Sequence, residues 1–443
     1  MGVVPGERRL FGTDGVRGAV GEFVTADLAL ALGRAAAAWA PSDSPQVLII
    51  RDTRESGEML EAALASGIAA AGGHALIAGV LPTPGAPLLT RRFGFDLAAV
   101  VSASHNPYRD NGIKLFGPDG VKLPDEAEAE IEAAVLAGEA PAVAPGRVRE
   151  LHGAGADYLR ELELRFQGLD LGGKRVLLDC ANGATYRVGP EIFRRLGANV
   201  ETVATEPDGR NINEGCGSTH IDRLAEAVPA GGYEVGFAFD GDGDRLLAVD
   251  RNGAVVDGDE LIALSALHLR GVGRLPGDGV AVTVMTNYGF HSAMAEAGIN
   301  VAVTDVGDRH VMAELTRRGW ALGGEQSGHI IDTGFAPSGD GIAASLLALE
   351  ALGDRDLADR DAMTKLPQLL INVKVATRGA LDSAPTVREE IDKASAALEG
   401  RGRVLVRASG TEPLIRVMVE APEAAECQEV AERLAQLVER ELG

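Results

Sequence analysis

Residues 234–245, EVGFAFDGDGDR, join an apolar run to a polar loop in which aspartates alternate with glycines. A continuous apolar run of this kind is typical of a strand that is buried on both faces. Two more apolar runs end in polar loops, LAAVVSASHNP (97–107) and the shorter WALGGEQSGH (320–329). Ligands of open α/β sheets bind outside the carboxyl ends of the strands. We therefore expect the three loops to line one shared site.

Each of these loops ends a unit of three strand-like runs with helical stretches between them. The runs lie at 46–50, 74–80 and 97–102, at 174–179, 198–204 and 234–239, and at 279–285, 299–305 and 320–324. Strands that alternate with helices predict α/β domains in which a sheet lies between helices. The three units are therefore expected to share one architecture.

The chain beyond residue 367 follows a different pattern. Strands are expected at 371–377, 402–408 and 413–420, and helices at 386–398 and 423–442. This order predicts a smaller two-layer α/β domain with a polar loop of its own, RASGTEP (407–413). The four expected domains are 1–155, 156–256, 257–367 and 368–443.

The composition restricts the class of protein. Of the 443 residues, 46% are apolar and 24% charged, as in ordinary globular proteins. The net charge of −23 disfavours nucleic acid and anionic membranes as partners. No apolar stretch approaches the ~20 residues that span a bilayer, the N-terminus lacks a signal-peptide segment, and three cysteines are too few for a disulfide framework. We expect a soluble cytoplasmic protein.

Asp240, Asp242 and Asp244 alternate with glycines directly after an expected strand. Three carboxylates at this spacing on a flexible loop can converge on one hard cation such as Mg²⁺. The loop is not an EF-hand, because Arg245 stands at the position that requires glycine and Arg251 at the position that requires glutamate. An acidic surface turn is the alternative to a metal site.

Ser104 lies in the loop SASHNP (102–107). Pro107 stands where a helix could begin, and the N-terminus of such a helix would suit a phosphate. Ser104 is therefore a candidate for a phosphorylated nucleophile, with a simple turn before a helix as the alternative. No G-x-S-x-G motif surrounds it, which argues against a serine hydrolase. In an extended chain His105 would point away from Ser104 and could not simply serve as its base.

Basic residues that could hold a phosphate lie within the polar loops. Locally gathered cations would offset the repulsion that the global charge imposes on an anion. The residues are Arg17, Arg54, Lys114, Arg245, Arg309, Arg407 and Arg416.

Two further loops offer groups that bind anions or sugars. In RASGTEP the backbone around Gly410 and the hydroxyls of Ser409 and Thr411 could form an anion nest. In GGEQSGH the side chains of Glu325 and Ser327 could bind sugar hydroxyls, and His329 could relay protons. Neither a Walker A loop nor a Rossmann glycine motif stands out. The pair Cys216 and His220 has half of a zinc spacing without a second half.

Six of these motifs together resemble the α-D-phosphohexomutase superfamily. They are FGTDGVRG (11–18), SASHNP (102–107), NGIK (111–114), DGDGDR (240–245), EQSGH (325–329) and RASGTEP (407–413), in the order that the family uses. CGSTH (216–220) and VGDRHV (306–311) look like the branch that acts on glucosamine phosphates, with His310 in place of an expected tyrosine.

The resemblance implies four domains around a central cleft and an enzyme of the isomerase class. Its reaction would interconvert glucosamine 6-phosphate and glucosamine 1-phosphate through phosphoserine 104 and a hexosamine 1,6-bisphosphate, which is also the activator. The product would serve UDP-N-acetylglucosamine and peptidoglycan synthesis. One Mg²⁺ would be held by the phosphate on Ser104 and by Asp240, Asp242 and Asp244. A possible homodimer is also implied.

The resemblance also assigns roles to other residues. The catalytic group besides Ser104 would comprise Arg17, Lys114, Arg245 and His329. The phosphosugar would be bound by Glu325, Ser327, Arg309, Arg407, Ser409, Gly410, Thr411 and Arg416.

Three alternatives remain open from the sequence. A sister enzyme of the superfamily would act on mannose or glucose phosphates. A non-catalytic sugar-phosphate sensor would share the fold, although the intact Ser104 and aspartate triad count against it. A D-x-D phosphatase is disfavoured, because DGDGDR lacks the hydroxyl residue that should follow the second aspartate.

Overall fold

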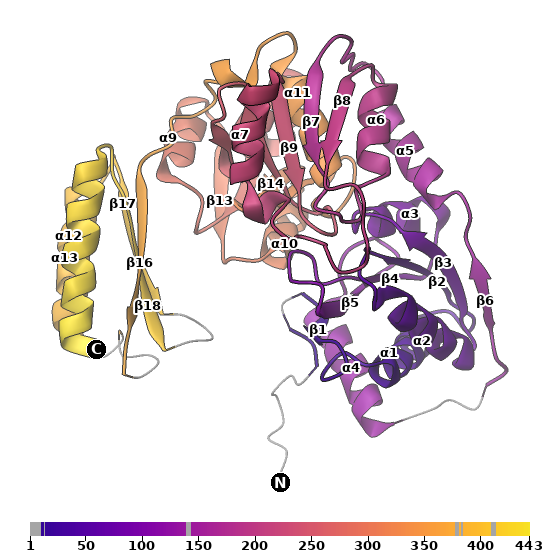
Figure 1. The fold of residues 1–443 in the computed structure, drawn as a ribbon. Helices are drawn as coiled ribbons and strands as arrows, with labels where there is room; N and C mark the ends of the chain where they lie inside the picture. Colours follow the sequence, from indigo (N-terminus) through magenta and orange to yellow (C-terminus); the bar gives the residue numbers. More distant parts are fainter. Residues whose placement is uncertain (1–9, 13, 139–142, 377–380, 382–383, 409–412) are drawn as a thin grey trace. The chain divides into compact units, whose positions relative to one another are not determined.

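The computed structural model describes residues 10–12, 14–138, 143–376, 381, 384–408 and 413–443 (Figure 1). Its contacts divide the chain into two compact units. The larger unit consists of residues 1–284 and 302–360, and the smaller unit consists of residues 285–301 and 361–443. Each unit is described by itself.

The first sheet of the larger unit has six strands in the order β1-β5-β4-β2-β3-β6. Strand β2 pairs in parallel with β3 and β4, whereas β5 pairs antiparallel with β4 and β1, so the sheet is mixed. Its central strands are apolar and buried over 47–50 and 97–101. Helices α1, α2 and α4 pack together on a shared core. The elements are β1 (Val16–Ala19), α1 (Ala26–Trp39), β2 (Gln46–Arg51), α2 (Gly57–Ala70), β3 (His74–Val80), α3 (Gly85–Phe93), β4 (Leu97–Val101), β5 (Asp110–Phe116), α4 (Asp125–Ala137) and β6 (Arg147–Glu150).

The second sheet has five strands in the order β11-β10-β9-β7-β8. Strand β9 is buried throughout, pairs in parallel with β7 and pairs antiparallel with β10, so the loop after it lies at the carboxyl end of two strands. The elements are α5 (Ala154–Arg165), β7 (Arg175–Asp179), α6 (Val188–Arg195), β8 (Asn199–Val203), η1 (Ser218–His220), α7 (Asp222–Gly231), β9 (Val235–Phe239), β10 (Leu246–Asp250) and β11 (Val255–Val256).

The third sheet has four strands in the order β13-β12-β14-β15. Its first helix, α8, begins at a capping box in which Asp257 and Glu260 satisfy each other's backbone amides. The elements are α8 (Gly258–Gly271), η2 (Pro276–Asp278), β12 (Gly279–Thr283), β13 (Asn300–Thr304), α10 (Asp308–Arg318), β14 (Leu322–Gly324), β15 (Ile330–Asp332), α11 (Gly341–Leu352) and η3 (Leu357–Asp359).

The smaller unit contains an antiparallel sheet in the order β16-β18-β17 with two helices on one face (Figure 1). Helix α13 packs on β16 and β18, and Cys427 on this helix donates its thiol to the Val419 carbonyl inside the core. The elements are α9 (Tyr288–Glu296), β16 (Gln368–Lys374), α12 (Pro385–Ala397), β17 (Arg403–Ala408), β18 (Leu414–Glu420) and α13 (Ala424–Leu442).

The fold class predicted from the sequence is confirmed: α/β sheets lie between helices, and a smaller two-layer domain follows them. In the described part of the chain, no helix combines the length and the apolar character needed to cross a membrane.

One local prediction is wrong. No helix begins at Pro107: a turn follows it, and strand β5 starts at Asp110.

Candidate active site

The loop that carries Ser104 is held in an unusual conformation. Ser104 has a φ of 50°, in the left-handed region that non-glycine residues seldom adopt. Its amide donates to the Ser102 hydroxyl over 2.9 Å. Its carbonyl accepts hydrogen bonds of 3.0 Å from both Arg54 and Asn213. Such strain persists only where the surroundings enforce it, and it is found at functional sites.

The left-handed turn changes the position of His105. Because the chain is not extended at Ser104, the Nδ1 atom of His105 lies 3.3 Å from the Ser104 hydroxyl. The expectation that His105 points away from Ser104 is therefore wrong. Burial and the nearby Arg245 lower the pKa of His105, so its ring is neutral at pH 7.

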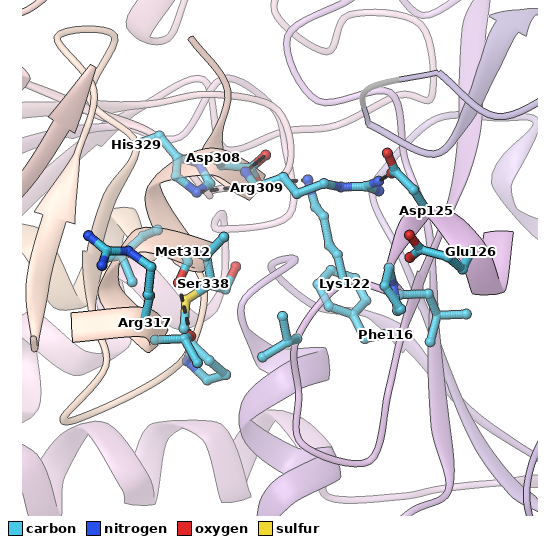
Figure 2. A pocket seen from close by; sticks show the side chains of 17 residues that line it. Phe116, Lys122, Asp125, Glu126, Asp308, Arg309, Met312, Arg317, His329 and Ser338 are labelled. Atoms are coloured by element: carbon cyan, nitrogen blue, oxygen red, sulfur yellow. Dashed lines mark hydrogen bonds and ion pairs between the residues drawn. The ribbon is translucent and has the colours of Figure 1, made fainter. Parts of the chain in front are cut away.

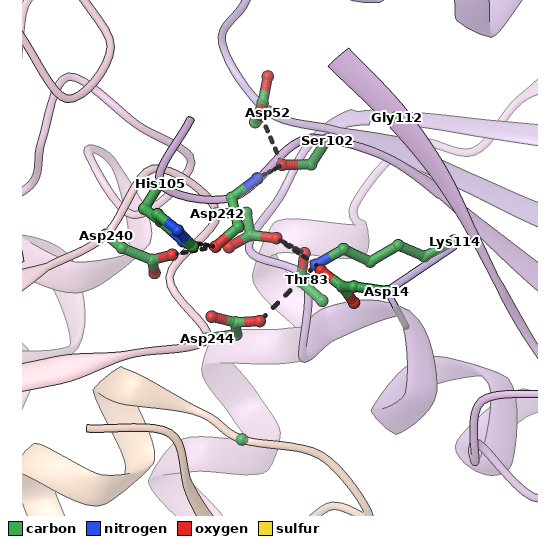
Figure 3. A network of polar contacts seen from close by, with 12 residues as sticks. Asp14, Asp52, Thr83, Ser102, His105, Gly112, Lys114, Asp240, Asp242 and Asp244 are labelled. Carbon is green, nitrogen blue, oxygen red and sulfur yellow. Dashed lines mark hydrogen bonds and ion pairs between the residues drawn. The ribbon is translucent and has the colours of Figure 1, made fainter. Parts of the chain in front are cut away.

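The three aspartates that follow β9 lie close together, next to Lys114 and His105 (Figure 3). Ligand atoms of Asp240, Asp242 and Asp244 all lie within 4.8 Å of one another, and all three residues are buried. The Ser104 hydroxyl donates to Asp240 Oδ2 over 2.5 Å. The Oδ1 atoms of Asp242 and Asp244 are buried without a hydrogen-bond partner. Unsatisfied carboxylate oxygens in a converging set fit a hard divalent cation.

The glycines of the DGDGDR loop allow the two chain segments to approach each other. A Cβ atom on Gly241 would lie 2.6 Å from the Ser104 carbonyl oxygen and 2.6 Å from Asn213 Nδ2. The metal loop and the serine loop are therefore in backbone contact at this point, which fixes the distance between the nucleophile and the carboxylates.

Lys114 on β5 lies beside the same carboxylates and is 1% exposed. Its Nζ is 3.0 Å from Asp242, 3.2 Å from Asp14 and 3.7 Å from Asp244. Burial lowers the pKa of Lys114, but the charges of Asp14 and Asp242 outweigh burial and raise it above its usual value. The ammonium is consequently charged at any physiological pH.

The pKa values of two of the aspartates are shifted in opposite directions. Burial and the neighbouring carboxylates Asp244 and Asp242 raise the pKa of Asp240 well above its usual value. Burial also raises the pKa of Asp244, but Lys114 and His329 outweigh it and lower this pKa. Two like charges held this close cannot both be ionised without a compensating cation.

The loop of the third domain reaches the metal loop through His329. The Nδ1 atom of His329 is 3.6 Å from Asp244, while its Nε2 accepts the Gly339 amide over 3.1 Å. The neutral ring therefore carries its proton on Nδ1. The charge of Asp244 overcomes the effect of burial and raises the pKa of His329, although a second proton on Nε2 would require breaking the bond from Gly339.

Glu325 and Ser327, the predicted sugar-binding pair, lie in the same loop. Glu325 is nearly buried and accepts the Gly307 amide over 3.0 Å. Ser327 is exposed. Arg309, another predicted substrate residue, is ion-paired with Asp125 and, over 2.8 Å, with Glu128.

A cavity of about 550 Å³ lies next to this loop (Figure 2). Lys122 and Asp125 line it from the first domain, and Asp308, Arg309 and His329 line it from the third. Apolar side chains such as Met312 supply much of the remaining wall. Charged groups beside an apolar wall are typical of a small-molecule site.

The other predicted cations have different environments. Arg245 is half-buried, and its backbone amide donates to Asp240 Oδ1 over 3.1 Å. Arg17 is ion-paired with Asp14. Arg54 is fully buried, paired with Asp52, and donates to two backbone carbonyls of the serine loop. Arg54 thus supports the backbone of the serine loop.

In the smaller unit, Arg407 on β17 and Arg416 on β18 are directly paired across the antiparallel ladder. Directly opposed residues project from the same face of a sheet. Ser409, Gly410 and Thr411 lie outside the described residues. Two like charges side by side destabilise a sheet unless an anion or acid neutralises them.

Sequence reasoning missed two residues of this site. Thr83 donates its hydroxyl to Asp242 over 2.7 Å, and Asp14 joins Lys114 to Lys122. Asp14 lies inside the motif FGTDGVRG, from which the search for cations identifies only Arg17. Thr83 lies in the segment LPTPG (81–85), which carries no sequence signal of a binding site.

A strained serine beside a buried carboxylate cluster, on α/β domains of this order, defines a phosphohexomutase site. The family domains described as "Phosphoglucomutase/phosphomannomutase, alpha/beta/alpha" match here as domain I over residues 8–142, domain II over 156–253 and domain III over 257–369. The C-terminal domain of the same family matches residues 370–437. The chain belongs to the phosphoglucomutase/phosphomannomutase family of the phosphohexomutase superfamily.

Comparison with related proteins indicates which branch of the superfamily the chain resembles most. The chain is 47% identical to the phosphoglucosamine mutase of Heliobacterium modesticaldum, covering 98% of this chain and 99% of that protein. It is 49% identical to the phosphoglucosamine mutase of Moorella thermoacetica, covering 95% and 97%. These relatives are phosphotransferases of the isomerase class.

Solved structures share the fold at lower identity. A phosphoglucomutase/phosphomannomutase family protein from Burkholderia thailandensis superposes with a TM-score of 0.81 at 23% identity over 97% of both chains. An N-acetylphosphoglucosamine mutase from Aspergillus fumigatus, solved with GlcNAc-6P and magnesium, gives 0.70 at 20% identity over 99% and 97%.

Proposed function

We propose that this protein interconverts glucosamine 6-phosphate and glucosamine 1-phosphate through phosphoserine 104. The observation that carries the proposal is the 2.5 Å hydrogen bond between the Ser104 hydroxyl and Asp240 within a buried triad of aspartates. The names of its relatives support the choice of sugar.

The reaction consists of two phosphoryl transfers. Phosphoserine 104 gives its phosphoryl group to the free hydroxyl of the substrate, which yields free serine and a hexosamine 1,6-bisphosphate. The bisphosphate then reorients in the site so that its other phosphate faces Ser104. Transfer of that phosphoryl group to Ser104 restores phosphoserine and releases the isomer. The same bisphosphate, added in trace amount, would phosphorylate any unmodified Ser104.

A divalent cation fits the aspartate triad, and we assign it as Mg²⁺. Asp240, Asp242 and Asp244 would hold it together with the phosphate on Ser104. When bound, Mg²⁺ neutralises charge on a transferring phosphoryl group.

The cationic side chains around the triad position and neutralise the phosphate. Lys114 stays protonated, so its role is that of a fixed positive charge or proton donor rather than a base. Arg245 and Arg17, whose charges act on His105, would supply further positive charge. The neutral ring of His105 lies 3.3 Å from the Ser104 hydroxyl and could exchange a proton with the serine oxygen, whereas Nε2 of His329 is occupied by the Gly339 amide.

The non-reacting phosphate is assigned to the smaller unit. Arg407 and Arg416 are paired across β17 and β18, so their guanidinium groups project from one face of the sheet and could together bind a phosphate. Ser409, Gly410 and Thr411 complete the proposed phosphate loop. Glu325, Ser327 and Arg309 are assigned to the sugar. The cytoplasmic location and the homodimer remain predictions.

A coupled mutase assay with Mg²⁺ and trace hexose 1,6-bisphosphate tests the function. It compares kcat/KM for glucosamine, glucose and mannose 6-phosphates. A preference for glucosamine of about 100-fold, or about 2.7 kcal/mol in the transition state, is expected. A preference for another sugar would keep the phosphoserine mechanism and change the substrate. Binding without turnover of any of the three would favour a sugar-phosphate sensor.

A further inference from the structure

Lys122 lies between two carboxylates that belong to distant segments, Asp14 near the start of the chain and Asp308 at the start of α10. Its Nζ atom is 2.5 Å from Asp14 Oδ1 and 2.6 Å from Asp308 Oδ2, and its side chain is 13% exposed. Figure 2 shows this side chain extending from the wall of the first domain toward Asp308. Buried charge pairs with such short contacts hold their partners in defined positions.

On one side, Lys122 adjoins the chemistry of the serine. Asp14 uses one carboxylate oxygen for Lys122 and the other for Lys114, at 3.2 Å. Lys114 in turn is 3.0 Å from Asp242 of the metal loop. Alternating charges thus run continuously from the metal loop to Lys122.

On the other side, Lys122 contacts Asp308, which adjoins the loop of Glu325 and Ser327 (325–329, here called the sugar loop). Asp308 is the first residue of α10, and the preceding Gly307 has a φ of 127° that favours glycine. The Gly307 amide donates to Glu325 Oε1 over 3.0 Å. A shift of Asp308 therefore moves the donor that orients Glu325.

Removal of Lys122 would leave the serine side with more charged contacts than the Asp308 side. Without Lys122, Lys114 still has Asp14, Asp242 and Asp244 within 4 Å. Asp308 would keep the hydrogen bond that its Oδ1 accepts from the Arg309 amide over 2.8 Å, and among the side chains that the structure describes as its ion-pair partners it would keep only the neutral ring of His329, at 3.7 Å. Loss of the lysine should therefore disturb the sugar loop far more than the phosphoryl-transfer groups.

We propose that Lys122 is a positioning residue for sugar recognition, which fixes Glu325 through Asp308 and the Gly307 amide. This inference rests on the proposed function, since it concerns the same site. Lys122, which the sequence motifs do not indicate, would hold the sugar loop at a fixed distance from the serine loop.

Steady-state kinetics with glucosamine 6-phosphate give the first test. Lys122→Met should raise KM by about 10- to 100-fold, the cost of a small displacement of a positioning group, with a much smaller change in kcat. Lys122→Arg, which keeps the cation, should recover most of the loss. Lys393→Met is the matched control, because Lys393 pairs with Glu389 and Glu390 on an exposed helix face. A fall in kcat at unchanged KM would overturn the proposal.

Binding is measured separately in a Ser104→Ala background, which cannot turn over. Calorimetry with glucosamine 6-phosphate should show the same loss of affinity when Lys122→Met is added, and Asp308→Asn should reproduce it from the other side of the contact. Equal affinities with and without Lys122→Met would overturn the proposal.

Hydrogen exchange of the ligand-free protein tests the positioning without any sugar. The amides of 306–309 should exchange faster in Lys122→Met than in Lys393→Met, and unchanged exchange would refute the inference. A Ser104→Ala protein that binds none of the three sugar phosphates would refute the proposed function instead, and the exchange result would still decide whether Lys122 holds the loop.

Discussion

Thr83 binds Asp242 through both its backbone and its side chain. The Thr83 amide donates to the Asp242 carbonyl over 2.8 Å, and its hydroxyl donates to Asp242 Oδ2 over 2.7 Å. The central aspartate of the triad is therefore oriented by a residue of the first domain, although it belongs to the second. Groups that orient metal ligands in this way tune the affinity for the metal.

Thr83→Val should weaken metal binding while leaving the fold intact. Valine keeps the shape of threonine but removes the hydroxyl donor, so the Mg²⁺ concentration for half-maximal activity should rise by about 10- to 100-fold. Titration of activity with Mg²⁺ measures the effect. Thr202→Val, on strand β8, is the matched control. Identical Mg²⁺ curves for both variants would show that Thr83 does not orient Asp242.

Ser104→Ala should abolish turnover, because the proposed reaction passes through phosphoserine at this position. Ser104→Thr retains a hydroxyl but places a β-branched residue at a φ of 50°, so it should recover little activity. The measurements are the mutase assay and the intact mass after incubation with bisphosphate. Ser66→Ala, on an exposed part of α2, is the control. Turnover by Ser104→Ala would end the covalent scheme.

Gly241→Ala should separate the serine loop from the metal loop. The new methyl group would lie 2.6 Å from the Ser104 carbonyl, so backbone must move. A displacement of this size near reacting groups can cost about 100-fold in kcat/KM. Gly168→Ala, where a Cβ atom meets nothing within 4 Å, should be neutral. If Gly241→Ala has wild-type kinetics, the close approach has no functional importance.

Asp340 should make the stability of the larger unit depend on pH. Burial raises the pKa of Asp340 to about 6 from 3.8, although Tyr158 donates to its carboxylate. The native state therefore binds more protons than the unfolded chain between these values. Stability consequently falls as the pH rises through this window, by at most roughly 3 kcal/mol, and stays lower above pH 6.

Asp340→Asn removes this titration and is nearly the same size. Urea unfolding from about pH 4 to pH 7 should show that the stability of the wild type relative to Asp340→Asn declines with pH. Asp43→Asn, at an exposed site, should keep the slope of the wild type. Parallel pH profiles for the wild type and Asp340→Asn would contradict this assignment.

The sequence predicted strands and the grouping of loops well, because both depend on local pattern. The run EVGFAF became β9 (Val235–Phe239), and the three polar loops meet within hydrogen-bond or ion-pair distance. Apolar runs are easy to recognise, and carboxyl ends of strands lie at one edge of a sheet. The resemblance to the phosphohexomutases is confirmed by all four family domains.

What the sequence did not predict depends on backbone conformation and on distant partners. The left-handed φ of Ser104 brings His105 back toward the hydroxyl, and no residue pattern signals it. Arg54 lies in a polar loop, where the sequence suggests a phosphate ligand. In the structure its guanidinium pairs with the buried Asp52 and donates to the Ser104 carbonyl. Pro107 permits a helix, yet the alternating residues of NGIKLF that follow pair as β5 instead.

The support of Ser104 by Asn213 has a consequence for biosynthesis. These residues are 109 positions apart, and Ser104 and Asp240 are 136 apart. A ribosome that adds about 5–20 residues per second needs roughly 7 to 27 s to cover the longer interval. During that time the first domain has already been synthesised with its nucleophile loop lacking both partners. The serine loop therefore gains its contacts with Asn213 and Asp240 only after the second domain has been synthesised and has docked.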